Sequence, residues 1–158
     1  MTELSAYHEA GHALMAIYVG AKVRSLTIDP DWDDGLDRYA DTQVEWPAGQ
    51  FSQREMQEKA MMVALAGPVA EMIQSGESYH PGFVAEWSSD WKLAWQAAKP
   101  LVPNEKKRLT YLEQATVRLY RLLERENYWA ALAAIVDNLL AHETLEGEQV
   151  EEIVSAWL

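Results

Sequence analysis

The stretch Ser5–Ala16, SAYHEAGHALMA, contains two histidines four positions apart, His8 and His12, with Glu9 beside the first. Apolar side chains recur every three or four positions across residues 2–19, which predicts an amphipathic helix ending at Gly20. Residues four apart project from one face of a helix, so both imidazoles can reach one metal ion. Glu9 is rotated by about 100° from His8. It would therefore lie beside the ion, where a general base for a bound water belongs.

The same residues are also compatible with an ordinary exposed helix face that carries two histidines and a solvated glutamate and binds no metal. A catalytic zinc takes three protein ligands plus water, so the metal interpretation depends on a partner elsewhere in the chain. Of the two other histidines, His80 is predicted to lie in a loop and His142 near the end of a helix, where ordinary structural roles are expected.

Two carboxylates are better candidates for the third ligand. Asp90 opens a predicted helix and is flanked by small and aromatic residues, although an acid in a first turn also complements the helix dipole. Glu71 lies in the apolar run GPVAEMI, where an acid needs a partner. We take Asp90 as the first choice for the third ligand and Glu71 as the runner-up.

The rest of the chain predicts a mostly α protein with a small β-sheet, an α+β domain that spans residues 1–158. Residues 22–28 and 38–46 read as strands on either side of an acidic turn. Ser52 and Glu55 form a capping box that starts a helix to about residue 74, before a stop at Gly76. Ser88–Asp90 offers capping side chains for a helix to residue 99. Further helices are predicted over 104–126, 128–142 and 147–158.

Composition limits the kinds of partner and compartment. The 158 residues are 49% hydrophobic and 24% charged, which is typical of a globular protein. With 25 acidic and 13 basic residues the net charge is −12, which argues against nucleic acid and membrane surfaces as partners. The absence of cysteine excludes disulfides and Cys-ligated zinc. No apolar run reaches the roughly 18 to 20 residues of a membrane span, and no signal peptide is visible, so we expect a cytoplasmic protein.

Three segments together resemble the peptidase domain of the FtsH family, whose members are membrane-bound, ATP-dependent zinc metalloproteases. They are SAYHEAGHALMA, then MVALAGPVAEMIQSG at residues 62–76, then the helix that opens on Ser-Ser-Asp90. The tail LLAHETLEGEQVEEI resembles the end of the same domain, so the similarity covers about residues 5–99 and 139–154. The family's usual Asn-Asp-Leu reads here as Ser-Asp90-Trp.

The resemblance implies a role for each matching residue. The family's histidine ligands fall on His8 and His12, its aspartate ligand on Asp90, and its catalytic glutamate on Glu9. Glu71 matches a family glutamate that does not bind the metal. The implied activity is that of a zinc-dependent endopeptidase of HExxH type, in which Glu9 acts as general base on a metal-bound water.

The resemblance also raises the question of how substrates arrive. No phosphate-binding G-x-x-x-x-G-K-[ST] loop occurs in the chain. We therefore expect a stand-alone peptidase domain without the ATPase and membrane anchor of the family, either as a relative that lacks them or as an isolated domain. Such an enzyme would cut unfolded or flexible polypeptides, or would work with a separate ATPase or as a homo-oligomer. The strand at residues 38–45 would hold an extended peptide by strand addition, or would be an ordinary edge strand. The alternative function is a non-catalytic zinc-binding scaffold derived from a peptidase.

Overall fold

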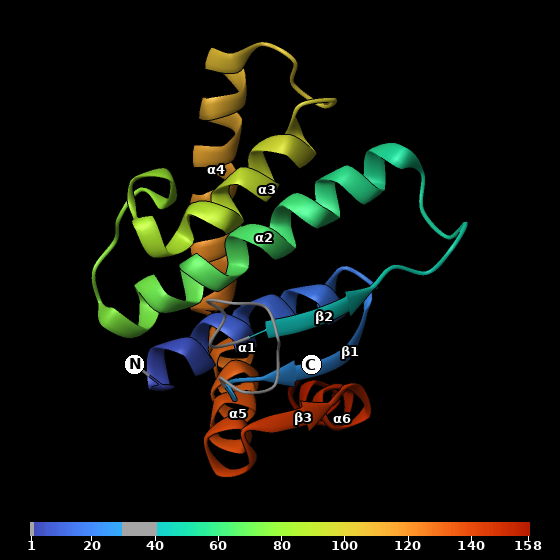
Figure 1. Ribbon diagram of the computed structural model, residues 1–158, viewed down its shortest axis with the longest axis vertical. Coiled ribbons are helices and arrows are strands. Elements are labelled where there is room, and N and C mark those ends of the chain that lie inside the picture. Colours follow the sequence, from blue (N-terminus) through green and yellow to red (C-terminus); the bar gives the residue numbers. More distant parts are fainter. Residues whose placement is uncertain (1, 30–40) are drawn as a thin grey trace.

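A computed structural model of the chain describes residues 2–29 and 41–158, which form a mostly helical structure with a small antiparallel sheet (Figure 1). This confirms the predicted α+β class. The helices are α1 (Thr2–Tyr18), α2 (Gln53–Ser75), α3 (Ser88–Ala98), α4 (Glu105–Leu123), α5 (Glu126–His142) and α6 (Gly147–Trp157). The strands are β1 (Lys22–Thr27), β2 (Asp41–Glu45) and β3 (Thr144–Glu146). None of the described helices is both long and apolar enough to cross a membrane.

The ends of the first two helices follow the predicted signals. Gly20 has a φ of 95°, a left-handed conformation that stops α1 at little cost for a residue without a β-carbon. Ser52 and Glu55 form both hydrogen bonds of the capping box at the start of α2. Gly76 adopts the left-handed conformation after the last turn of α2, and Pro68 is buried within the helix.

The start of α3 differs from the prediction that Ser88–Asp90 would cap it. Residues Ala85–Trp87 form a short 3₁₀ turn that leads directly into the helix, and no side chain caps its first turn. The main-chain N–H of Ser88 instead donates to the carbonyl of Ala85. Asp90 lies within the first turn, so its carboxylate is available for contacts with another helix.

The sheet has the strand order β2-β1-β3, and both neighbours run antiparallel to β1. The pairing of β1 with β2 is the one the sequence predicts, while residues 38–40 and most of the acidic turn lie outside the described residues. The third strand, β3, was not predicted. It is only three residues long and pairs Leu145 with Leu26 and Thr144 with Thr27. Strand β2 lies at one edge of this sheet.

Helix α1 is the central element, since it packs against α2, α5 and both β1 and β2. Its contact with α2 is close because both helices carry small residues where they meet. A β-carbon at Gly11 would lie 2.5 Å from the carbonyl oxygen of Ala66 and 2.8 Å from the side chain of Ala70. Glycine at position 11 thus allows the two helix backbones to approach each other beside His8 and His12.

Candidate metal centre

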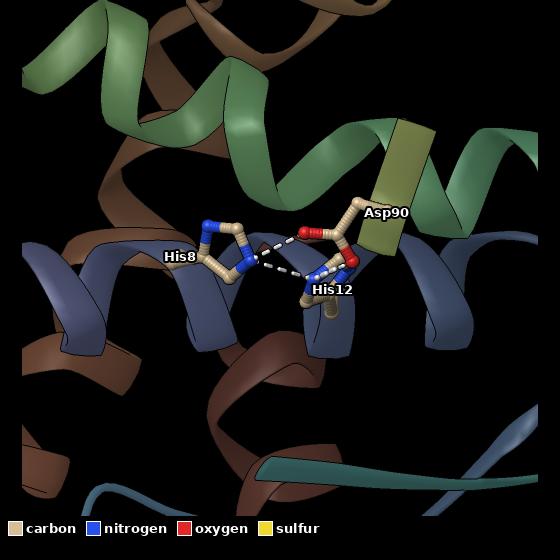
Figure 2. Close-up of side chains that lie close together, drawn as sticks. All are labelled: His8, His12 and Asp90. Carbon is tan, nitrogen blue, oxygen red and sulfur yellow. Dashed lines mark hydrogen bonds and ion pairs between the residues drawn. The ribbon is translucent and has the colours of Figure 1, made fainter. Parts of the chain in front are cut away.

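His8, His12 and Asp90 meet between α1 and α3, as Figure 2 shows. The Nε2 atom of His8 lies 2.8 Å from Oδ2 of Asp90, and Nε2 of His12 lies 3.3 Å from Oδ1 of the same carboxylate. The two Nε2 atoms are 3.1 Å apart. Three possible metal-ligand atoms, two from α1 and one from α3, therefore converge on one point.

The opposite ring nitrogens are held by helix α2. Nδ1 of His12 lies 2.7 Å from the carbonyl oxygen of Val63. Because a carbonyl can only accept, Nδ1 of His12 carries a proton. Nδ1 of His8 lies 2.5 Å from Oε2 of Glu71, whose carboxylate accepts in the same way. In the neutral form of each ring, these bonds leave the Nε2 lone pairs directed at Asp90.

The donor set fits a divalent metal ion such as zinc. Two imidazole nitrogens and one carboxylate oxygen form a three-ligand set of the kind found in catalytic zinc sites. Ligand bonds of about 2.0 to 2.1 Å in a tetrahedral arrangement separate two ligand atoms by roughly 3.3 Å. The two Nε2 atoms are 3.1 Å apart, and each lies 2.8 or 3.3 Å from one of the two Asp90 oxygens, which is close to that value. Three electron-pair donors this close together require a cation or protons between them.

Without a metal ion, protons serve this purpose. Burial alone would lower the pKa of His8, but hydrogen bonds to the Asp90 and Glu71 carboxylates outweigh it and raise the pKa to about 10. Burial also opposes the charged form of His12, and the Asp90 carboxylate again raises its pKa above the ordinary value. Burial would raise the pKa of Asp90, but the hydrogen bonds from His12 and His8 lower it. The metal-free centre is thus an ion-paired cluster that holds protons near neutral pH.

The two sequence candidates for the third ligand occupy different sides of His8. Asp90 faces the Nε2 atoms, whereas Glu71 bonds to Nδ1 on the other side of the ring. The same Glu71 oxygen accepts a 2.7 Å hydrogen bond from Nε1 of Trp87, which is buried just before α3. Glu71 thus has the position of an outer partner that orients a ligating histidine. Sequence reasoning did not identify Trp87, whose contact depends on the turn Ala85–Trp87.

Glu9 is buried beside the cluster but is not among the three converging side chains. Its negative charge contributes to the raised pKa of both His8 and His12. Its Oε1 accepts a 2.5 Å hydrogen bond from the hydroxyl of Thr42 on β2. The sequence left this strand as either a peptide-binding edge or an ordinary edge strand, and it did not identify Thr42, because the contact depends on how the sheet packs against α1.

A glycine in α2 makes room for the centre. A β-carbon at Gly67 would overlap the imidazole of His12, including its Nε2 atom. The ring of His12 therefore lies directly on the backbone of α2, and any larger residue at position 67 would displace it. In the sequence, Gly67 stands next to Pro68 within GPVAEMI, a pair that indicates an irregular helix. The pattern alone does not show that this glycine makes room for the ring of His12.

The remaining histidines are not part of the cluster. His80 contacts Oε2 of Glu113 through Nε2 at 3.1 Å and accepts the N–H of Gly82 through Nδ1. Its ring also contacts Trp91 edge-on, with ring centroids 5.0 Å apart. His142 is exposed in the last turn of α5. Both positions agree with the structural roles that the sequence favours for them.

Comparison with known proteins assigns neither a family nor a function to this chain. No family model matches the chain, and no curated protein matches it either. A functional interpretation must therefore rest on the chemistry of the centre and on the sequence resemblance described above.

Proposed function

We propose that this protein is a zinc-dependent endopeptidase that hydrolyses peptide bonds in unfolded or flexible polypeptides. In this proposal His8, His12 and Asp90 bind the metal and Glu9 is the general base. The observation that carries it is the convergence of His8, His12 and Asp90, whose possible ligand atoms all lie within 4.8 Å of one another, next to a buried glutamate.

The chain's own residues have separate tasks in this reaction. A zinc ion held by the three ligands would polarise the substrate carbonyl and lower the pKa of a bound water towards about 7. Glu9 takes the proton of the attacking water and later passes it to the leaving amine. Glu71 and the Val63 carbonyl keep the two imidazoles oriented, because each bonds to a ring nitrogen that faces away from the centre.

The proposed substrate class rests on the lack of an ATP-binding motif in the sequence. Since no phosphate-binding loop occurs within these 158 residues, energy-driven unfolding would have to come from elsewhere. We therefore propose substrates that are already extended, or delivery by a separate ATPase or within a homo-oligomer. Strand β2 lies at the sheet edge and contacts Glu9 through Thr42, so it is well placed to align an extended peptide.

Metal content and cleavage of an unfolded protein, measured on the same preparations, test the proposal. The purified wild type should bind about one zinc per chain and cleave a fluorescein-labelled, chemically unfolded protein. Glu9→Gln should keep the zinc and lose cleavage, because it removes the base but no ligand. Asp90→Ala should lose far more zinc than Glu71→Ala, because only Asp90 is proposed to bind the ion.

Three results would count against this proposal, either as a whole or in part. Failure to bind zinc at neutral pH would refute it as a whole. Full zinc content without cleavage of any unfolded substrate would favour the non-catalytic scaffold. Greater zinc loss in Glu71→Ala than in Asp90→Ala would move the third ligand to Glu71.

A further inference from the structure

Thr42 connects the sheet edge to the carboxylate of Glu9. Its hydroxyl oxygen lies 2.5 Å from Oε1 of Glu9 and 3.3 Å from the main-chain carbonyl oxygen of the same residue. A hydroxyl has one proton, and the shorter contact is to the charged oxygen, where the hydrogen bond is stronger. Among the described residues, Thr42 is the only side chain that bonds to this carboxylate.

This contact fixes a side chain that otherwise has considerable freedom. A glutamate has three side-chain torsions, and the last of these has broad energy wells. Thr42 is itself stiff, because it is β-branched and its strand is paired with β1 through the partner Leu26, which is fully buried. One oxygen of Glu9 is thus anchored to a rigid donor, which leaves the other oxygen for a proton transfer.

We propose that Thr42 is the positioning residue of the general base. The inference rests on the proposed peptidase function and adds a residue that the histidine motif does not contain. Thr42 holds the Glu9 carboxylate in one orientation relative to the ligands on α1, and it ties that orientation to the place of β2. Loss of the hydroxyl would let the carboxylate rotate away without removing a metal ligand.

Steady-state cleavage by two Thr42 variants tests this role. Thr42→Val keeps the shape of the side chain but removes the donor. It should lower kcat about tenfold or more, with KM and zinc content unchanged, because the base is misplaced only in the chemical step. Thr42→Ser restores the hydroxyl and should return kcat to within about threefold of the wild type.

A control and a second measurement separate positioning from general support of the sheet. Thr27→Val is the matched control: it removes a hydroxyl of the same sheet that bonds to the carbonyl of Glu143 and the hydroxyl of Thr144 rather than to Glu9. It should lower the melting temperature and leave kcat unchanged. In metal-free protein, the double variant of Thr42→Val and Glu9→Ala should lose less melting temperature than the sum of the two single losses. The reason is that both substitutions break the same hydrogen bond.

The outcomes distinguish this inference from the function on which it rests. A wild type that cleaves nothing overturns both. If the wild type cleaves, normal kcat in Thr42→Val, failure of Thr42→Ser to restore kcat, or additive melting-temperature losses each overturn the role of Thr42 alone. An equal loss of kcat in Thr27→Val would likewise overturn it, by showing a general effect of the sheet.

Discussion

Helix α1 packs against two neighbours in two different ways. Towards α2 it presents Gly11, and the backbones approach so closely that a β-carbon there would lie 2.5 Å from the carbonyl of Ala66. Towards α5 it presents aromatic rings, and Tyr7 stacks on Trp129 with centroids 5.6 Å apart and planes 13° apart. One interface is built from small residues and the other from large ones.

The difference shows what the proposed metal centre requires of its surroundings. Only a close helix pair brings main-chain and side-chain acceptors of α2 to the Nδ1 atoms of His8 and His12. The aromatic interface supplies buried area and stacking, which hold α1 in place without contacting the ligand atoms. Damage to the first interface should therefore affect metal binding, while damage to the second should affect stability alone.

The largest effect is expected from Gly67→Ala. The added methyl group would overlap the His12 ring, and the helix backbone of α2 cannot move away without losing its packing on α1. We expect loss of stoichiometric zinc and a fall of about 100-fold or more in cleavage. Metal analysis and circular dichroism on the same sample measure this. Alanine is the better helix former by about 1 kcal/mol, so unchanged zinc with a higher melting temperature would contradict the prediction.

A smaller effect is expected from Glu71→Gln, which keeps the shape but removes the charge behind His8. Outer partners of ligating histidines typically contribute 10- to 100-fold to metal affinity, so zinc binding should weaken by about that factor. Competition with a chromophoric chelator measures the affinity. Glu113→Gln is the matched control, because Glu113 also contacts a histidine, His80, but away from the centre. Equal weakening in both variants would argue against a specific role for Glu71.

The stability of the metal-free protein should depend on pH through the cluster of His8, His12 and Asp90. The folded pKa of His8 is raised from 6.5 to about 10, so its stabilising contribution is complete below about pH 6.5 and is lost as the pH rises towards 10. The pKa of Asp90 is lowered from 3.8, so its contribution is present above that value and is lost as the pH falls. The cluster should therefore stabilise the metal-free fold most between about pH 4 and 6.5.

Thermal melts at several pH values, with and without zinc, test this dependence. Metal-free protein should lose melting temperature between pH 6.5 and 9, and Asp90→Asn should flatten that slope. With zinc, the melting temperature should instead rise with pH through the acid range, because the imidazoles must release protons to bind the ion. A metal-free melting temperature that rises from pH 6.5 to 9 would contradict the ion-paired description of the centre.

The smallest effect on the centre is expected from Trp129→Leu on the aromatic side of α1. The loss of the stack on Tyr7 should cost about 1 to 2 kcal/mol of unfolding free energy. Zinc content and kcat per folded molecule should stay at the wild-type level, since Trp129 stacks on Tyr7 and is not a member of the cluster of His8, His12 and Asp90. Urea unfolding together with metal analysis measures both. Loss of zinc in this variant would show that the two interfaces are not independent.

The sequence was most informative where side-chain chemistry marks a position locally. Gly20, Gly76 and the capping box at Ser52 predicted helix ends that the structure confirms. The motif and the choice of Asp90 also predicted three side chains that the structure brings together. The contacts that complete the centre were harder to predict. The carbonyl of Val63 has no side-chain signature, and the partners Glu71–His8 and Thr42–Glu9 are joined only by tertiary packing.

The pairing of β1 with β3 has a consequence for how the molecule folds. Thr27 and Thr144 bond across the sheet although they are 117 positions apart, and a β-carbon at Gly147 would overlap the carbonyl of Val23. Contacts so distant along the chain form only after the entropy of closing a long loop has been lost, which makes such pairing slow. Strand β1 pairs with β2, which carries Thr42 and through it contacts Glu9. Strand β1 is therefore flanked on both sides only after residues 144–146 have paired with it. We expect the Glu9 carboxylate to reach its final orientation among the last steps of folding.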